Sequence, residues 1–307
     1  MLAPKIKLNN GEEMPSLGFG TFLSNDNEAE EAVKVAIDCG YRHIDTAFVY
    51  ENEVEVGRAV NQKISEGVVS RSDLFIVSKL GGIHHDPKLV EHACRLTLRK
   101  LNLEYLDLFL IHFPVGMKYV SDDILHTQPN ETDYLDTWHA MEKLVDLGLV
   151  KSIGISNFNS QQTERIVQNC RIKPVTNQVE CHPGFNQKKL VEYSKKHGIV
   201  ITAYAPLARP QPENRWPVFL YDSTAKALEQ KYGKTSVQIC LRYLMQSGVV
   251  PIPKSVTKSR IESNFNVLDF ELSPEDMKVM DGYNNGRRLI PFSGLRNHVY
   301  YPFGIEF

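Results

Sequence analysis

Residues 144–156 read LVDLGLVKSIGIS, and this pattern sets the architecture of the chain. Apolar residues at helical spacing come first, then Gly148, and then a short run with β-branched residues. Glycine is favoured directly after a helix because it tolerates the left-handed conformation, and a short β-branched run is typical of a strand. The same succession recurs at 195–206 (KKHGIVITAYAP) and at 244–254 (LMQSGVVPIPK). The sequence therefore predicts repeated units in which a helix turns directly into a strand.

The whole chain alternates between strand and helix patterns. Strands are predicted at 17–21, 42–45, 74–79, 106–112, 151–156, 174–180, 199–204 and 249–253. Helix patterns lie at 29–37, 86–101, 133–146, 160–168 and 187–197. Strands that alternate with helices pair in parallel, and eight of them in 307 residues favour an α/β fold of the closed (β/α)8 TIM-barrel type. An open sheet remains an alternative, because periodicity alone does not establish closure.

Both ends of the chain add to this barrel. An Asn-Gly turn between 5–8 and 14–16 predicts an N-terminal β-hairpin. We also expect an extra C-terminal helix and loop, and one domain over residues 1–307. The conformation of residues 287–301 does not follow from the pattern.

Composition excludes several classes of partner. The net charge is −2 with both signs mixed along the chain, so no basic surface favours nucleic acid or an anionic membrane. The N-terminus lacks the apolar stretch of a signal peptide, and no apolar run approaches the ~18 residues that span a bilayer. The 5 cysteines are scattered without CxxC spacing, which is typical of reduced thiols. We therefore expect a cytoplasmic monomer.

Four residues that can carry or orient a proton follow three of the predicted strands. Asp45 and Tyr50 belong to the stretch HIDTAFVY at 43–50, Lys79 closes the next strand, and His112 closes the one after that. A lone lysine or histidine at a strand end is more often a surface charge or a satisfied polar group. Parallel barrels build their active sites at this end of the strands, so the four together predict a catalytic site.

Two further groups of residues suit a nucleotide. Lys254 and Arg260 flank the start of a short predicted helix, which favours a phosphate, although a solvated basic turn explains them equally well. Amide, hydroxyl and aromatic groups also follow the later strands, and they suit a flat ring that bears an amide: Ser156, Asn157, Gln178 and Tyr204. A plain polar rim of the barrel is the competing interpretation. The glycine fingerprint of a Rossmann turn is missing after Gly20, so any nucleotide binds without one.

Two adjacent pairs of possible metal ligands invite a metal interpretation. They are His84 with His85 and Cys181 with His182, and neither has the spacing of a zinc site. We therefore expect no metal site and place these residues in surface or rim loops.

The chain resembles the aldo-keto reductase superfamily, and its aldose reductase-like members most. The resemblance runs from about residue 6 to 307. It rests on GFGT at 18–21, GYRHIDTAFVYENEVEVG at 40–57, LDLFLIHFP at 106–114, VKSIGISNF at 150–158, NQVECHP at 177–183 and IPKSVTKSRIESNF at 252–265. It implies a (β/α)8 barrel that reduces aldehydes and ketones to alcohols with NADPH.

The resemblance also implies a role for each site residue. Asp45, Tyr50, Lys79 and His112 match the catalytic tetrad, in which Tyr50 is the general acid and His112 orients the carbonyl. A neighbouring ammonium is expected to lower the pKa of the phenol, because it stabilises phenolate. The expected cofactor contacts are Thr21, Asp45, Ser156, Asn157, Gln178, Tyr204, Leu207, Arg209, Lys254, Ser255, Val256, Arg260 and Asn264. Lys254 and Arg260 match the clamp of the 2′-phosphate, so the resemblance favours NADPH over NADH.

Three departures from the family pattern affect the expected site. Ser263 stands where members of this type have Glu, which weakens one adenine contact. The stretch YAPLAR at 204–209 has lost two hydroxyls of the family loop YSPLGS, so the pyrophosphate relies on Arg209 and the backbone at Leu207. Fewer tryptophans line the expected substrate pocket. Phe22, Gly81 and Phe113 stand where aldose reductase has Trp. The residues expected to line the pocket are Phe22, Tyr50, Gly81, His112, Phe113 and Trp216.

Gly81 is expected to leave the space of a whole side chain, which favours bulky hydrophobic carbonyls. Two alternatives stay open: a dedicated steroid or ecdysteroid ketone reductase, and a non-catalytic barrel that binds NADPH or serves a structural role.

Overall fold

The computed structural model describes residues 2–123, 127–305 and 307. Its main sheet has eight strands in the order β12-β11-β10-β9-β6-β5-β4-β3, and every neighbouring pair is parallel. The strands are β3 (Phe19–Gly20), β4 (His43–Asp45), β5 (Phe75–Leu80), β6 (Leu106–Ile111), β9 (Val150–Ser156), β10 (Thr176–Glu180), β11 (Val200–Tyr204) and β12 (Val249–Pro251).

Two backbone hydrogen bonds join the first strand to the last. The N–H of Gly18 donates to the carbonyl of Pro251 at 3.0 Å, and that of Gly20 donates to Pro253 at 3.1 Å. A Cβ on Gly20 would lie 2.9 Å from the carbonyl oxygen of Ile252, so only glycine permits this approach. The sheet therefore closes on itself, and the expected (β/α)8 barrel is confirmed.

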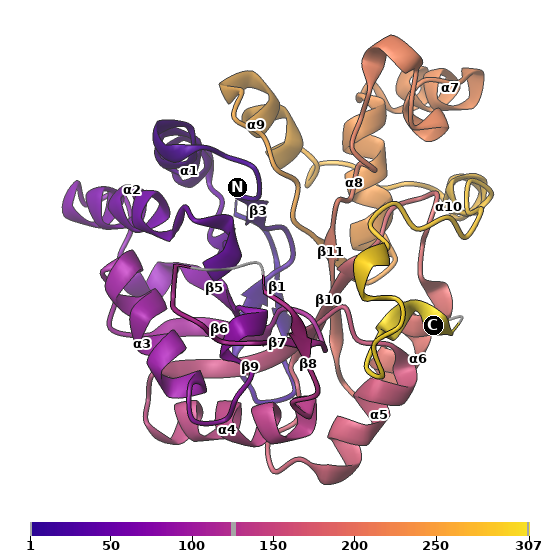
Figure 1. The fold of residues 1–307 in the computed structure, drawn as a ribbon. Coiled ribbons are helices and arrows are strands. Elements are labelled where there is room, and N and C mark those ends of the chain that lie inside the picture. The colour runs from indigo at the N-terminus through magenta and orange to yellow at the C-terminus, as the bar shows by residue number, and fades with distance from the viewer. Residues whose placement is uncertain (1, 124–126, 306) are drawn as a thin grey trace.

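Helices surround the strands on the outside of the barrel (Figure 1). They are α1 (Asp26–Cys39), α2 (Glu53–Ser65), α3 (Val90–Leu101), α4 (Tyr134–Asp146), α5 (Ser160–Asn169), α6 (Lys188–Lys196), α7 (Ser223–Tyr232), α8 (Ser236–Gln246) and α9 (Lys258–Phe265). The additional α10 (Pro274–Asp281) precedes a C-terminal loop, as expected. Among the described residues, no helix is both long and apolar enough to span a bilayer.

Alternation along the strands divides the core into two layers. On β5, Phe75 and Val77 pack in the cluster inside the barrel, whereas Ile76 packs in the cluster beneath the helices. Successive side chains of a strand point to opposite faces, so Lys79 points into the barrel one step above Val77. The strand register thus places the Lys79 side chain inside the carboxyl-terminal end of the barrel.

Local signals account for several element ends. Gly40 ends α1 at φ 112°, where its N–H bonds to the last turn of the helix. Asp133 caps α4, because its side chain accepts from the N–H of Leu135. The helix expected from residue 86 begins only at Val90, because Asp86 accepts from the N–H of Lys88 in a preceding turn.

Two hairpins lie outside the main sheet. The predicted N-terminal hairpin is present as β1 (Lys5–Lys7) and β2 (Glu13–Pro15), and Met14 packs in the cluster inside the barrel. The second hairpin pairs β7 (Gly116–Met117) with β8 (Pro129–Asn130). Its strands are too short to show an alternating pattern, so the sequence analysis did not predict it.

Candidate active site

The four predicted proton-handling residues meet at the carboxyl-terminal end of the barrel. Lys79 Nζ lies 2.5 Å from Asp45 Oδ1 and 3.3 Å from the hydroxyl oxygen of Tyr50. The carbonyl of Thr46 accepts from the same ammonium at 2.8 Å. The rings of Tyr50 and His112 meet edge to face, with centroids 5.7 Å apart. The chain thus forms a linked series from carboxylate to ammonium to phenol, with an imidazole beside the phenol.

Separate elements hold these side chains in position. Asp45 ends β4, Lys79 lies on β5, and His112 directly follows β6. Tyr50 ends the 3-10 helix η1 (Phe48–Tyr50), which follows β4 and turns the phenol back over the barrel. Because three of the four residues sit at the ends of paired strands, their separation is fixed by the barrel itself.

Burial controls the electrostatics of this group. Lys79 is 0% exposed, and burial lowers its pKa while the adjacent Asp45 carboxylate opposes that shift. Burial raises the pKa of Tyr50 well above its ordinary value, and the negative charge of Asp45 adds to the rise. Burial lowers the pKa of His112, with a further contribution from the Lys79 charge, so its imidazole is neutral at pH 7.

The expectation that Lys79 lowers the pKa of Tyr50 is wrong for this structure. The dehydration of a phenolate in this site outweighs the attraction of the ammonium 3.3 Å away. Tyr50 therefore keeps its proton throughout the neutral range.

The later strands bring the expected amide and hydroxyl groups to the same end of the barrel. The amide Nε2 of Gln178 donates to Asp45 Oδ2 at 2.7 Å. Ser156 Oγ donates to the carbonyl of Gln178, and the Tyr204 hydroxyl donates to Asn157 Oδ1 at 2.7 Å. These groups satisfy one another, and they line the region beside Asp45 from β9, β10 and β11.

The loop after β11 has an unusual backbone. Ala205, Ala208 and Arg209 all have positive φ angles, between 47° and 56°. Arg209 is exposed and Leu207 is half-buried. After β3, the Thr21 hydroxyl donates to the carbonyl of Asp45 at 3.0 Å, so Thr21 supports the backbone at Asp45.

The expected phosphate residues lie together around the start of α9. Lys254 Nζ donates to the carbonyl of Leu23 at 2.9 Å, and burial lowers the pKa of this lysine. The Ser255 hydroxyl accepts from the N–H of Thr257, which precedes the helix. Arg260 and Val256 are exposed, while Asn264 is buried. The group offers two cations and free first-turn N–H groups to an anion.

One of the expected aromatic pocket residues contacts the phenol, and the others lie on loops. The ring of Phe22 is 43% exposed and lies 5.0 Å from that of Tyr50, between centroids. Phe113 packs against Phe292 of the C-terminal loop at 4.7 Å. Trp216 lines a small cavity with Ala208 and Arg287, on the loop after β11.

The space expected at Gly81 is filled. A Cβ at this position would lie 2.9 Å from Cδ1 of Phe48 and 3.6 Å from Cγ1 of Val49. The ring of Phe48, from the turn that carries Tyr50, thus lies where the first atom of a side chain at this position would be. The inference that Gly81 opens the substrate pocket is therefore wrong.

The two pairs of possible metal ligands lie at the rim of the barrel, but they are buried rather than at the surface. His84 and His85 are both 0% exposed, and Cys181 and His182 are 0% and 2% exposed. His84 nevertheless joins two residues distant in sequence, which the spacing rules for zinc sites did not bring together.

One buried acid of this region did not follow from the sequence pattern. Glu180 ends β10 and is 0% exposed. Its carboxylate accepts from the backbone N–H of Leu289 at 2.6 Å and of Ile290 at 2.8 Å. Glu180 therefore anchors the C-terminal loop to the barrel. Its place two residues after Gln178, on the same face of the strand, is the signal that would have found it.

Comparison with known proteins agrees with this geometry. The aldo/keto reductase family matches residues 16–285. Prostaglandin F synthase 1 of Bos taurus is 44% identical, covering 99% of this chain and 98% of its own. Estradiol 17 beta-dehydrogenase 5 of Mus musculus is 42% identical, covering 98% of each.

Solved structures are similar over their whole length. The aldo-keto reductase of Bombyx mori, in complex with NADP, superposes with a TM-score of 0.92 at 40% identity, covering 98% of this chain and 99% of its own. The aldose reductase of Schistosoma japonicum gives a TM-score of 0.93 at 41% identity, covering 99% and 100%. The chain belongs to the aldo/keto reductase family and is an NADP-dependent oxidoreductase that acts on carbonyl groups.

Proposed function

We propose that this enzyme reduces aldehydes and ketones to alcohols with NADPH, and that Tyr50 is the general acid. The observation that carries the proposal is the buried series from Asp45 through Lys79 to the Tyr50 hydroxyl. When bound, NADPH supplies the hydride, which is the cofactor's own chemistry.

The chain's own residues deal with the proton. A general acid must hold its proton until the carbonyl oxygen becomes basic, and the raised pKa of Tyr50 ensures this at neutral pH. The ammonium of Lys79 then stabilises the phenolate as the proton leaves, while Asp45 and Thr46 hold the ammonium in place. The neutral imidazole of His112, beside the phenol, orients the carbonyl oxygen.

The residues present fit the cofactor. Ser156, Asn157 and Gln178 offer amide and hydroxyl groups to the carboxamide, and Tyr204 offers an aromatic face to the ring. Lys254 and Arg260 hold the 2′-phosphate. The further contacts are Thr21, Asp45, Leu207, Arg209, Ser255, Val256 and Asn264. Gln178 already bonds to Asp45, so the cofactor pocket and the catalytic group share a hydrogen bond.

The substrate is a hydrophobic carbonyl compound larger than a simple sugar aldehyde. Aromatic rings support this assignment, because Phe22 flanks Tyr50 and Phe113 packs against Phe292 of the C-terminal loop. The names of the relatives point the same way, since one is a prostaglandin F synthase and another an estradiol dehydrogenase. A ketone on a fused-ring scaffold is therefore a second candidate substrate. Trp216 remains a predicted contact at the edge of the pocket.

Replacement of Tyr50 tests the acid. Tyr50→Phe keeps the ring and removes the proton, so turnover should fall by ~10²–10⁴-fold, the usual contribution of general acid catalysis. NADPH oxidation is followed optically with a panel from small aldehydes to polycyclic ketones, and NADPH binding is measured separately. NADPH affinity should stay within a few-fold of wild type.

Tyr105→Phe is a matched control, because Tyr105 lies beside Arg71 and Lys151, away from the tetrad. It should leave turnover unchanged. Turnover of Tyr50→Phe within a few-fold of wild type would remove Tyr50 from the acid role, and inactivity of the wild type on every carbonyl would favour a non-catalytic barrel.

A further inference from the structure

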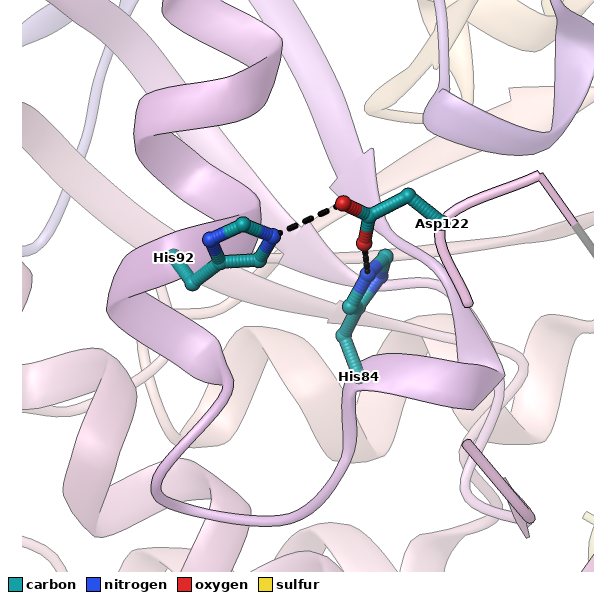
Figure 2. Close-up of side chains that lie close together, drawn as sticks. All are labelled: His84, His92 and Asp122. Carbon is teal, nitrogen blue, oxygen red and sulfur yellow. Dashed lines mark hydrogen bonds and ion pairs between the residues drawn. The ribbon is translucent and has the colours of Figure 1, made fainter. Parts of the chain in front are cut away.

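The carboxylate of Asp122 lies between the imidazoles of His84 and His92, as Figure 2 shows. Asp122 Oδ1 is 2.9 Å from His84 Nε2, and Asp122 Oδ2 is 2.9 Å from His92 Nε2. These three residues, the His84 cluster, come from three separate segments. His84 ends the 3-10 helix η3 (Gly82–His84), His92 lies on α3, and Asp122 lies between β7 and β8.

The cluster is closed on one side and open on the other. The side chain of His84 is 0% exposed, whereas those of His92 and Asp122 are 43% and 30% exposed. His84 is held from behind, because its ring meets that of Phe48 edge to face at 4.8 Å. An ion therefore has a fixed imidazole to bind and a path from solvent along the other two side chains.

The three ligand atoms suit a divalent transition metal. They lie within 4.8 Å of one another, and a tetrahedral zinc site with bonds of ~2.0–2.2 Å places its ligand atoms ~3.3–3.6 Å apart, so binding requires the side chains to close in by about 1 Å. Two imidazole nitrogens with one carboxylate oxygen form a borderline donor set, which zinc accepts, whereas calcium and magnesium require oxygen ligands. We propose that His84, His92 and Asp122 bind Zn²⁺, with water in the fourth position.

The surroundings set limits on the affinity. Zinc would take the Nε2 lone pairs, so the proton of each ring would sit on Nδ1. The Nδ1 of His84 is buried and has no hydrogen-bond partner among the described residues. Strong zinc sites give this proton an outer acceptor, and loss of one lowers affinity by ~10–100-fold. The site therefore suits an exchangeable ion more than a permanent one.

Occupation would tie together parts of the chain that border the active site. The ion would link the segment after β7 to α3 and to the turn that follows β5. His84 packs against Phe48, which lies in the same 3-10 helix as Tyr50. Bound zinc should thus stabilise the rim of the barrel and raise its resistance to heat.

Zinc titration of the full chain tests the site. Metal-stripped, reduced protein competes for Zn²⁺ with a chromogenic indicator, and thermal unfolding is recorded with and without the ion. Wild type should bind one equivalent that His92→Gln and Asp122→Asn each weaken by at least ~100-fold, because each removes a direct ligand. The melting temperature of wild type should rise with Zn²⁺, and those of the two variants should not.

His197→Gln is the matched control, because His197 also pairs with a carboxylate, Glu164, at 3.4 Å on another face. It should bind zinc like wild type. The proposal would be overturned if wild type bound no zinc within the range of affinities that the indicator can report. Equal binding by wild type, His92→Gln and Asp122→Asn would also overturn it, because the zinc would then lie elsewhere. Since His92 is exposed and Asp122 is half-buried, their variants should fold, and unchanged activity without zinc verifies this.

Discussion

Arg260 lies in the first turn of α9 and is exposed to solvent. It makes no ion pair within the described part of the chain. A guanidinium so placed is available to an incoming phosphate. Charge-assisted hydrogen bonds contribute about 1.5–3 kcal/mol, so Arg260→Ala should weaken NADPH binding by ~10–150-fold. NADH, which lacks the 2′-phosphate, should bind nearly as before. Fluorescence titration with both cofactors measures the difference.

Lys258→Ala is the control for this prediction, since Lys258 lies on the same helix and only approaches Glu262 at 4.0 Å. It should change the binding of neither cofactor by more than a few-fold. Equal losses for NADPH and NADH in Arg260→Ala would show that Arg260 does not recognise the 2′-phosphate.

Gly81 is packed against the turn that carries the proposed acid. Because a Cβ would lie 2.9 Å from Phe48, Gly81→Ala should displace that ring and destabilise the protein by ~1–3 kcal/mol, the usual effect of overpacking. Turnover should fall as well, because Phe48 and Tyr50 share one 3-10 helix. Denaturant unfolding and steady-state kinetics measure the two effects.

Gly294→Ala is its control, because nothing lies within 4 Å of a Cβ there and its φ is not positive. That variant should match wild type in stability. A Gly81→Ala variant as stable and active as wild type would mean that Phe48 moves aside freely.

At the scale of elements, the carboxylate of Glu180 links β10 to the C-terminal loop. Glu180→Gln keeps the shape of the side chain, but its amide can accept from only one of Leu289 and Ile290 at full strength. The loop should then open more often, so the backbone N–H groups of both residues should exchange faster with deuterium. KM for bulky substrates should rise, because Phe292 lies on the same loop and packs against Phe113.

Glu192→Gln is the matched control, since Glu192 is exposed on α6. Its exchange rates and KM should equal those of wild type. Unchanged exchange at residues 289 and 290 in Glu180→Gln would mean that other contacts hold the loop.

Local pattern predicted the elements well where short-range chemistry decides the backbone. Gly40 ends α1 and Asp133 caps α4 because each acts within one helical turn. The meeting of the proposed catalytic residues was also predictable, because barrel topology brings Asp45, Lys79 and His112 to one rim. The filled space at Gly81 was not, since it depends on which rotamer Phe48 adopts against a neighbouring strand. Nor was the His84 cluster, because Asp122 reaches it from a loop without a sequence pattern.

At the scale of the whole molecule, buried histidines make stability depend on pH. Burial lowers the pKa of His43 and lowers that of His85 to about 3. Unfolded histidine titrates near ~6.5, so below that pH the unfolded chain binds more protons than the folded chain. The free energy of unfolding should therefore decrease as the pH decreases. For His85 alone, the decrease between about pH 6.5 and pH 5 should be ~2 kcal/mol.

Denaturant unfolding at several pH values, with a chelator present, measures this slope. His85→Leu removes one such proton, so its slope below about pH 6.5 should be shallower by up to ~1.4 kcal/mol per pH unit. His197→Gln changes a partly exposed histidine instead and should keep the wild-type slope. Identical slopes for wild type and His85→Leu would show that His85 is not buried as a neutral ring.

The pairing of the β3 and β12 segments has a consequence for folding during synthesis. Its hydrogen bonds run from Gly18 and Gly20 to Pro251 and Pro253. The first barrel strand therefore cannot complete its pairing until the last strand has been synthesised. While the ribosome is still making residues in between, the growing sheet keeps two unpaired edges, and such edges recruit other chains. A chain that ends before residue 249 would therefore form a sheet that cannot close, although it contains all four proposed catalytic residues.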